Sequence, residues 1–300
     1  MGAAIGFIGL GTMGFPMMSQ LAKSGTQVIA YDADPQVCTR ASEVAGVSVA
    51  AHPREVAERS SIVFTCLPND EIVNSVYQGE EGILQAARPE LITCDCSTVY
   101  PDTTLALAEA LKAKGTVHMD TTMLGSQPQA LTGEVFFIVA GDEAALPKIK
   151  PALDIMGRLH IYTGPSASGN KVKLIHNALG NLNYVAVAEA LALAIQSGVD
   201  PQVFYEVVCK GGGQAYSRAF DVKGAMMLAG DLKPRFKLTL AAKDSRLAMQ
   251  LADQLKVPTP VLDMAREHLR EAEAAGHGDE DAAAVCTVIE GRIGRALSGK

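Results

Sequence analysis

The sequence predicts an α/β domain built on a parallel sheet, then a long connecting helix, then an all-α domain. Three observations predict this. Short β-rich runs alternate with helical runs through residues 1–164. A glycine-rich turn follows the first of these runs, and after residue 165 no further strand pattern appears. A chain of 300 residues is expected to form two domains. We expect the first to span residues 1–164 and the second to span residues 165–300.

The expected strands are continuous apolar runs separated by helices. That pattern is typical of a parallel sheet covered on both faces. The strands are expected at residues 3–10, 27–32, 61–67, 91–97, 116–123, 134–142 and 159–165. Helices are expected at residues 16–25 and 101–115.

The second half of the chain begins with one long helix over residues 168–197. Ser166 or Ser168 is expected to cap it, and Gly198 to end it. The rest is helical, with breaks expected at residues 211–213, 230, 258 and 276–279. We expect this half to complete the substrate site and to mediate dimerisation.

Composition excludes several classes of function. The net charge is −7 and there is no basic run, so no nucleic-acid partner is predicted. No apolar run of membrane-spanning length and no signal peptide is predicted. The six cysteines lack metal-site spacing, so we expect reduced thiols, no metal and a cytoplasmic protein.

The first strand leads into a GxGxxG turn that opens a helix. Gly9 allows the tight turn, Gly11 lets the backbone approach a pyrophosphate, and Gly14 lets helix and strand pack closely. In this context the motif predicts a Rossmann-type dinucleotide site. The residues expected to bind the cofactor here are Gly9, Leu10, Gly11, Thr12, Met13 and Gly14.

The second expected strand ends at Asp32, 18 residues after Gly14. An acid at this place accepts hydrogen bonds from the ribose hydroxyls of the adenosine and repels a 2′-phosphate. No arginine follows directly, since Arg40 is eight residues further on. We therefore favour NAD over NADP. A turn or helix-capping role for Asp32 is the alternative, and Asp34 fits that role equally well.

The long helix carries a narrow polar stripe. At about 100° per residue, one arc holds Lys173, Asn177, Gly180, Asn181 and Tyr184, and another holds Val172, Ile175, Leu179, Leu182 and Ala186. The stripe either meets solvent or faces a cleft. Lys171 points about 160° away from Lys173 and is expected on the surface.

Several separated motifs resemble the β-hydroxyacid dehydrogenase family, typified by 3-hydroxyisobutyrate dehydrogenase. The resemblance covers nearly the whole chain. The motifs are GFIGLGTMGFPM at the glycine turn, TCLPND at Thr65 to Asp70, CDCSTVYPDT at Cys94 to Thr103, SGNKVKLIHN on the long helix, LAAKDSRLA around Lys243 and GHGDEDAAAV around Asp281.

The resemblance implies roles for these residues. Lys173 matches the family's general acid/base, and Asn177 matches the asparagine that orients substrate and lysine. The TCLPND loop and the Ser/Thr pair imply cofactor contacts from Leu67, Pro68 and Thr98, and Lys243 joins them from the helical domain. For the substrate anion we expect Ser97, Thr98, Gly125 and Ser126, with Lys173 and Asn177 beside them. Arg218 is a weaker candidate.

The chain departs from the family in two places. One lies in the stretch from Asp120 to Gly133, which corresponds to the family's substrate-binding stretch, and the other lies on the long helix. In the stretch, Leu124 stands where a serine normally binds the substrate carboxylate, and Ser126 stands at the second glycine. The substrate is expected to be a 3-hydroxy acid or related hydroxy-anion, and these departures favour a different anion or a larger chain over 3-hydroxyisobutyrate. The pattern K-x-x-H-N, which contains His176, is similar to the equivalent helix of 6-phosphogluconate dehydrogenases. His176 could equally contact the substrate or be a structural imidazole without a catalytic role.

Alternatives stay open. They are a sugar-acid or sulfonate-aldehyde reductase on the same architecture, an imine reductase, or a non-catalytic NAD-binding protein. Lys173 argues against the last two, since imine reductases commonly lack a lysine at this position. The long apolar helical region predicts a homodimer or homotetramer.

Overall fold

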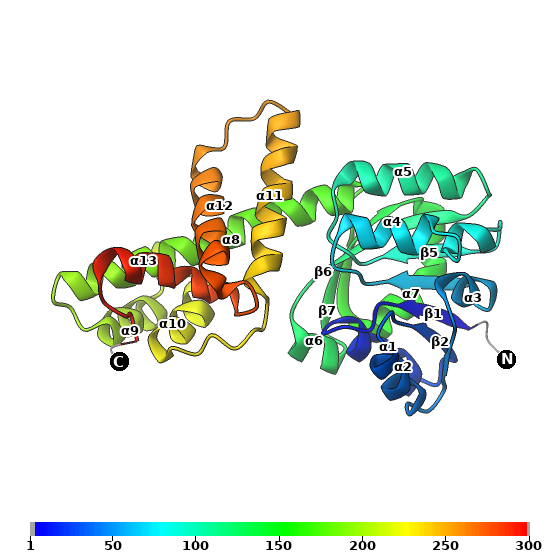
Figure 1. Cartoon of the computed structure of the whole chain (residues 1–300), viewed down its shortest axis with the longest axis horizontal. Helices are drawn as coiled ribbons and strands as arrows, with labels where there is room; N and C mark the ends of the chain where they lie inside the picture. Colours follow the sequence, from blue (N-terminus) through cyan, green and yellow to red (C-terminus); the bar gives the residue numbers. More distant parts are fainter. Residues whose placement is uncertain (1–3, 299–300) are drawn as a thin grey trace. The chain divides into compact units, whose positions relative to one another are not determined.

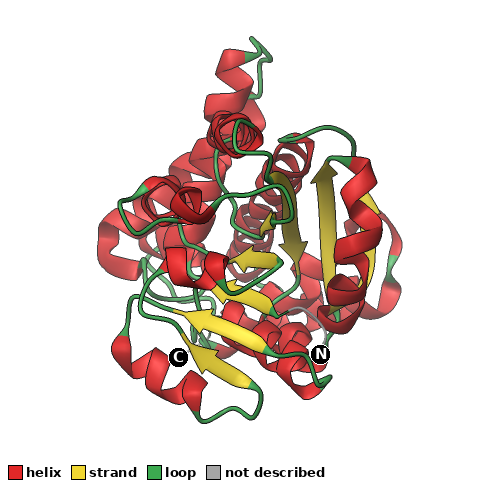
Figure 2. Ribbon diagram, turned by 90° about the vertical axis from the view of Figure 1, so that its right-hand side faces the viewer, coloured by secondary structure: helices red, strands yellow, loops and turns green. Residues whose placement is uncertain are grey.

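The computed structural model describes residues 4–298 and divides the chain into two compact units. The first extends to Lys173 and the second begins at Leu174, so the division falls inside the long helix. Figure 1 shows the elements along the chain, and Figure 2 shows them coloured by type.

The first unit is an eight-stranded sheet in the order β3-β2-β1-β4-β5-β6-β7-β8. The strands are β1 (Ile5–Ile8), β2 (Val28–Tyr31), β3 (Val47–Val49), β4 (Ile62–Thr65), β5 (Ile92–Asp95), β6 (Val117–Leu124), β7 (Val135–Gly141) and β8 (Gly157–Tyr162). The order reverses direction at β1, which is the topology of a Rossmann-type domain. The sequence prediction of that fold is confirmed.

One expectation about the sheet is wrong. β7 runs antiparallel to β6, with Met119 opposite Gly141, whereas every other pair in the sheet is parallel. Only residues 125–134 separate the two strands. A parallel return needs a crossover of about a dozen residues or more, so this short link forces the reversal. The short edge strand β3 is also absent from the predicted set.

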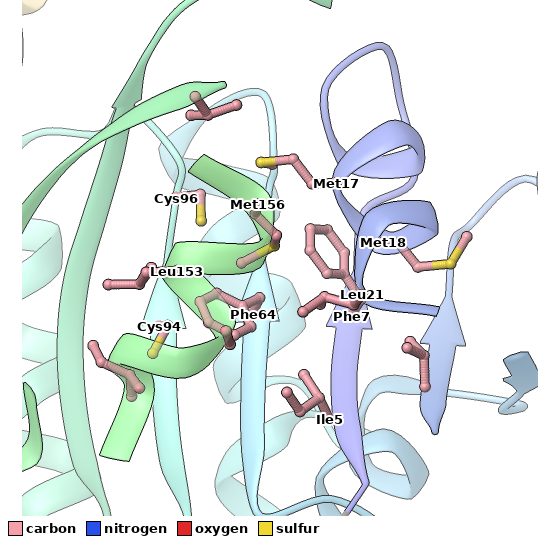
Figure 3. Close-up of a cluster of buried hydrophobic side chains, with 14 of the residues drawn as sticks. Ile5, Phe7, Met17, Met18, Leu21, Phe64, Cys94, Cys96, Leu153 and Met156 are labelled. Atoms are coloured by element: carbon pink, nitrogen blue, oxygen red, sulfur yellow. The ribbon is translucent and has the colours of Figure 1, made fainter. Parts of the chain in front are cut away.

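Helices cover both faces of the sheet. One face carries α1 (Gly14–Lys23), α2 (Pro35–Ser42), α6 (Gln127–Thr132) and α7 (Leu146–Met156), and the other carries α3 (Pro53–Glu58), α4 (Asp70–Gln78), η1 (Ile83–Ala86) and α5 (Pro101–Lys112). Figure 3 shows the first core, where Phe7 and Phe64 from the sheet meet Met17 and Met156 from the helices. Aliphatic side chains dominate both cores, with methionine and cysteine sulfur in the first, in a chain without tryptophan.

The second unit is all helical. It contains most of α8 (Ser168–Gln196), then α9 (Pro201–Gly211), α10 (Ala225–Ala229), α11 (Leu238–Gln254), α12 (Pro260–Ala272) and α13 (Cys286–Ile293), with short 3₁₀ or π turns between them. As predicted, α8 is followed by Gly198 with a φ of +83°. Leu191, Phe220 and Val285 belong to one continuous core in this unit.

The start of α8 differs from the sequence prediction. The hydroxyl of Ser168 pairs with Thr163 Oγ1 at 3.0 Å. The carboxylate of Asp120, on β6, takes the first-turn N–H groups instead. Its oxygens accept hydrogen bonds from Ala167 N at 3.2 Å, Gly169 N at 3.1 Å and Asn170 N at 3.4 Å. A charged acceptor at a helix N-terminus also complements the helix dipole.

By length and composition alone, α8 is the one helix among residues 4–298 that could cross a membrane. Half of that segment is buried inside the protein, as in a core helix. Its amide side chain at Asn181 is 2% exposed and hydrogen-bonded to Ala241 O and Ser245 Oγ. These contacts are those of a helix packed against protein.

Candidate active site

The glycine turn after β1 has the shape of a phosphate-binding loop. A Cβ on Gly9 would lie 2.4 Å from Cys66 O, and one on Gly14 would lie 1.9 Å from Gly9 O, so neither position tolerates a side chain. Gly11 is exposed and meets nothing within 4 Å. The turn is thus closed toward the sheet and open toward solvent, and α1 begins there without a side-chain cap. A pyrophosphate fits this cradle.

Asp32 ties the end of β2 to the glycine turn. Its Oδ2 accepts a hydrogen bond from Leu10 N at 2.6 Å, and its Oδ1 accepts one from Asp34 N at 2.9 Å. Asp34 caps α2 through Gln36 N. The capping role therefore belongs to Asp34, and the turn role that was the alternative for Asp32 is present in its contact with Asp34 N. An ionised carboxylate has about four acceptor positions, which leaves Asp32 capacity for ribose hydroxyls.

Two loops follow the adjacent strands β4 and β5, and Ser97 joins them. Its hydroxyl donates to Asp95 Oδ1 at 2.6 Å and accepts from Leu67 N at 2.9 Å. Ser97 is 2% exposed, whereas Thr98 is half-buried and Pro68 is exposed. Burial raises the pKa of Asp95 above its usual range. Ser97 thus links the two loops, and its hydroxyl points into the domain.

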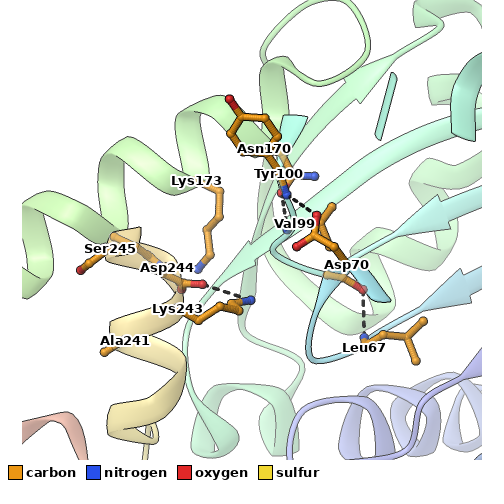
Figure 4. Close-up of polar contacts among 12 residues, drawn as sticks. Leu67, Asp70, Val99, Tyr100, Asn170, Lys173, Ala241, Lys243, Asp244 and Ser245 are labelled. Atoms are coloured by element: carbon orange, nitrogen blue, oxygen red, sulfur yellow. Dashed lines mark hydrogen bonds and ion pairs between the residues drawn. The ribbon is translucent and has the colours of Figure 1, made fainter. Parts of the chain in front are cut away.

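Lys173 lies in the first turns of α8 and is half-buried (Figure 4). Its ammonium group donates a 2.7 Å hydrogen bond to the carbonyl oxygen of Met123, near the end of β6. Lys171, two residues earlier, is exposed as predicted. Lys171 and Lys173 therefore lie on different faces of α8, as the helical wheel predicts.

Asn177 lies one turn after Lys173 on α8 and belongs to the second unit. Its Nδ2 donates to Asp244 Oδ2 at 2.6 Å, and Lys243 Nζ lies 3.2 Å from the other oxygen of that carboxylate. His176 is exposed, and its Nδ1 lies 3.1 Å from Asn177 Oδ1. The buried Asp244 thus orients both Asn177 and Lys243.

The stretch after β6 supplies the remaining predicted residues. Gly125 adopts a φ of +135°, which favours glycine, and is exposed. Ser126 precedes α6, and both its N–H and its hydroxyl donate to Gln129 Oε1, at 2.9 and 2.7 Å. Leu124 is half-buried beside them. The Ser126 hydroxyl keeps acceptor capacity only, because its proton is used locally.

Three acids hold predicted site residues, two in the first unit and one in the second, and the sequence prediction assigned none of them a role. Asp95 supports the two loops, Asp120 caps the helix that carries Lys173, and Asp244 orients Asn177. Burial raises the pKa of Asp120 to about 6. A signal was available for each, since all three lie within the motifs quoted above or in the stretch from Asp120 to Gly133. Their side-chain partners, however, are far away in sequence.

The arrangement is suited to acid–base chemistry on an alcohol or carbonyl. A lysine can take the proton of a hydroxyl or give a proton to an alkoxide, and the ammonium also stabilises the developing negative charge. Binding to a carbonyl oxygen holds Nζ in one place before a ligand arrives. Arg218, the weaker anion candidate, is exposed and has no such fixed position among the described contacts.

Two family models together match most of the chain. Residues 4–164 match the family described as the NAD binding domain of 6-phosphogluconate dehydrogenase. Residues 167–289 match the family described as NAD-binding of NADP-dependent 3-hydroxyisobutyrate dehydrogenase.

Individual relatives match at full length. The 2-(hydroxymethyl)glutarate dehydrogenase of Eubacterium barkeri is 34% identical, covering 98% of this chain and 97% of that protein. The 3-sulfolactaldehyde reductase of Escherichia coli is 31% identical, covering 99% of both. The structure of Mycobacterium tuberculosis 3-hydroxyisobutyrate dehydrogenase with L-serine has a TM-score of 0.88 at 28% identity, covering 96% of this chain and 99% of that one.

Proposed function

Because the chain belongs to the β-hydroxyacid dehydrogenase family, we propose that it interconverts a 3-hydroxy acid, or a related hydroxy-anion, and the corresponding semialdehyde or ketone. It is an oxidoreductase that uses NAD or NADP and acts on a CH–OH group of a small molecule. The observation that carries the proposal is the hydrogen bond from Lys173 Nζ to Met123 O on β6. It fixes the position of the lysine, and this reaction requires a positioned proton donor and acceptor.

We assign Lys173 as the general acid/base. In the oxidative direction its neutral amine takes the hydroxyl proton, and in the reductive direction its ammonium protonates the alkoxide. Asn177 lies one turn along the same helix, and its amide is fixed by Asp244. Its Oδ1 pairs with His176 Nδ1, and its Nδ2 keeps a second N–H, so both atoms retain capacity to orient the substrate and the lysine.

The dinucleotide is held by the glycine turn, Asp32 and the two loops after β4 and β5. Residues Gly9 to Gly14 bind the pyrophosphate, Leu67, Pro68 and Thr98 bind the remainder, and Lys243 joins them from the helical unit. When bound, the nicotinamide supplies the hydride donor or acceptor. We propose NAD as the preferred form, because a carboxylate at Asp32 is complementary to ribose hydroxyls and repels a 2′-phosphate.

The substrate anion is expected at Gly125 and Ser126, with Thr98 on the neighbouring loop. Ser97, the other residue expected there from the sequence, is buried with its hydroxyl engaged by Asp95 and Leu67. Leu124 places an apolar side chain where the family has a serine and leaves the hydroxyl to Ser126, which favours an anion other than the usual one. The 2-(hydroxymethyl)glutarate in the name of the E. barkeri relative is our first candidate. A sulfonated aldehyde is the second, because a relative 31% identical reduces 3-sulfolactaldehyde.

We also propose a homodimer or homotetramer in the cytoplasm. The apolar arc of α8 faces outward, with Ile175 60% exposed, Leu179 57% and Leu193 71%. Large apolar side chains in a row on one helix are typical of a covered surface. Light scattering on the purified protein tests this, and a monomer at micromolar concentration contradicts it.

The function is tested by following NADH formation with NAD⁺ or NADP⁺ across 3-hydroxy acids, sugar acids, hydroxy-sulfonates and serine analogues. We expect turnover of at least one 3-hydroxy acid with a substituent at C2, and a kcat/KM at least about tenfold higher with NAD⁺, since this corresponds to one charge-assisted contact. No turnover in either direction, with aldehydes and imines included, contradicts the proposal. Turnover only of imines favours the imine reductase alternative.

A further inference from the structure

A buried chain of hydrogen bonds converges on Asp95, the last residue of β5. The side chain is 1% exposed. Its Oδ1 accepts hydrogen bonds from Thr65 Oγ1 at 2.7 Å, Ser97 Oγ at 2.6 Å and Ser97 N at 3.1 Å. Three donors on one oxygen is a strong arrangement for a carboxylate. The other oxygen, Oδ2, is buried and has no hydrogen-bond partner among the residues that the structure describes.

From Asp95 the hydrogen bonds reach the loop between β4 and α4, the end of β4 before it and the last turn of α4. Through Ser97, it binds the backbone N–H of Leu67 at 2.9 Å. Through Thr65, it reaches the hydroxyl of Tyr77 on α4 at 3.0 Å. The single proton of Thr65 goes to Asp95, so Tyr77 is the donor in that contact. One carboxylate therefore fixes Thr65, directly before the loop over residues 66–69, and through Ser97 also fixes Leu67 within it.

The same bonds determine what Ser97 can do. A hydroxyl has one proton, and Ser97 gives it to Asp95. One of its lone pairs is taken by Leu67 N, and the side chain is buried. This leaves Ser97 poorly placed to bind a substrate anion directly. Its neighbour Thr98 is half-buried and lies on the same loop.

We propose that Asp95 and Ser97 are positioning residues, which lock the loop of Leu67 and Pro68 to the loop of Thr98 so that both bind the dinucleotide as one preformed surface. The proposal rests on the proposed cofactor site. A loop that is fixed in advance loses less conformational entropy when a ligand binds, so affinity rises without any new contact.

Each variant is chosen for the hydrogen bonds that it removes or keeps. Ser97→Ala removes the link to Leu67 N and also one of the three donors to Asp95 Oδ1. Asp95→Ala removes the acceptor for both hydroxyls. Asp95→Asn keeps an oxygen that can accept at the position of Oδ1, so it is the conservative rescue. Thr93→Val is the matched control. Thr93 lies on the same strand and the same face, and its buried hydroxyl pairs with His118 Nδ1 at 2.8 Å, away from both loops.

The test is titration of the full-length protein with NADH, without substrate, followed by the increase in NADH fluorescence. We expect the dissociation constant to rise about 3- to 10-fold in Ser97→Ala and in Asp95→Ala, in keeping with the loss of one hydrogen bond. Asp95→Asn is expected within about twofold of wild type, and Thr93→Val is expected to be unchanged although less stable. Hydrogen exchange of the Leu67 amide is expected to accelerate in Ser97→Ala.

The outcomes separate the inference from the function. If Ser97→Ala binds NADH like wild type and only the substrate KM rises, Ser97 contacts substrate and the inference is overturned. An unchanged exchange rate at Leu67 overturns it as well. If wild type itself binds no NADH, the proposed function fails, and the inference fails with it. Should Asp95→Ala not fold, the single hydroxyl removed in Ser97→Ala carries the test.

Discussion

The ammonium group of Lys173 donates a 2.7 Å hydrogen bond to the backbone carbonyl of Met123, so a strand of the sheet sets the position of a side chain on α8. The same strand supplies Asp120, which binds the first turn of that helix. β6 therefore holds both the helix end and its lysine. The following predictions test whether these contacts have the roles assigned to them.

Replacing Lys173 with alanine is expected to lower kcat at least about a hundredfold, because general acid–base catalysis typically contributes about 10²–10⁴-fold. The protein should remain folded, since the side chain is only half-buried. The measurement is steady-state turnover with the best substrate of the panel. Lys171→Ala is the control, an exposed lysine on the same helix that should retain full activity. Near-normal turnover in Lys173→Ala contradicts the assignment.

Gly169→Ala is expected to destabilise the protein by about 1–3 kcal/mol, as overpacking does. The new Cβ would lie 3.0 Å from Asp120 Oδ2 and 3.1 Å from its Cβ, and this carboxylate is held by three N–H groups and cannot shift freely. Turnover should fall as well, because the turn before Lys173 moves. Thermal unfolding measures the first effect.

Gly180→Ala is the control for stability on the same helix. A Cβ added at Gly180 would meet nothing within 4 Å, so alanine should stabilise the helix by about 0.5–1 kcal/mol. If both variants shift the melting temperature in the same direction, the close approach at Asp120 is not what requires glycine at 169.

Lys223→Met is expected to destabilise the helical unit by about 3–5 kcal/mol, because it leaves a buried carboxylate without its cation. Lys223 pairs with Asp281, which is fully buried and also accepts N–H bonds from Arg235 and Phe236. Calorimetry should show the loss. The exposed pair of Lys210 and Glu206 is the control, and its removal should have no measurable effect.

Unfolding stability should depend on His118 below neutral pH. Burial lowers the pKa of His118 to about 4, from about 6.5 in the unfolded chain. Between these values the unfolded state binds the extra proton, so the contribution is present above pH 6.5 and is lost as the pH falls toward 4. This contribution of His118 to the free energy of unfolding is up to about 3 kcal/mol. Asp120, whose folded pKa is raised to about 6, has the opposite slope.

His118 and Asp120 change the free energy of unfolding with pH in opposite directions. The test is therefore the difference in free energy of unfolding between wild type and His118→Asn, followed as a function of pH. The unfolding free energy of the variant should fall less steeply between pH 6.5 and 4, while Asp120 acts equally in both proteins. Equal slopes in the two proteins would show that His118 is protonated in the folded state.

Much of the site could be predicted from sequence because its signals are local. The glycine turn needs three residues at fixed spacing, and the structure shows Gly9 and Gly14 with no room for a side chain. The contrast between Lys173 and Lys171 follows from helix periodicity. The reversal of β7 had a signal too, since the link over residues 125–134 is too short for a parallel return.

What the sequence by itself determined is the order of strands and helices, the dinucleotide motif and the lysine of the polar stripe, because each depends on residues close together in the chain. Only the tertiary structure decided how the long-range polar contacts pair. Asp120 replaces Ser168 as the cap of α8, Ser97 turns its hydroxyl toward Asp95, and the polar stripe of α8 faces protein at Asn181 while its apolar arc faces outward at Ile175. A buried carboxylate binds whichever donors the fold brings to it, and periodicity carries no information about that pairing.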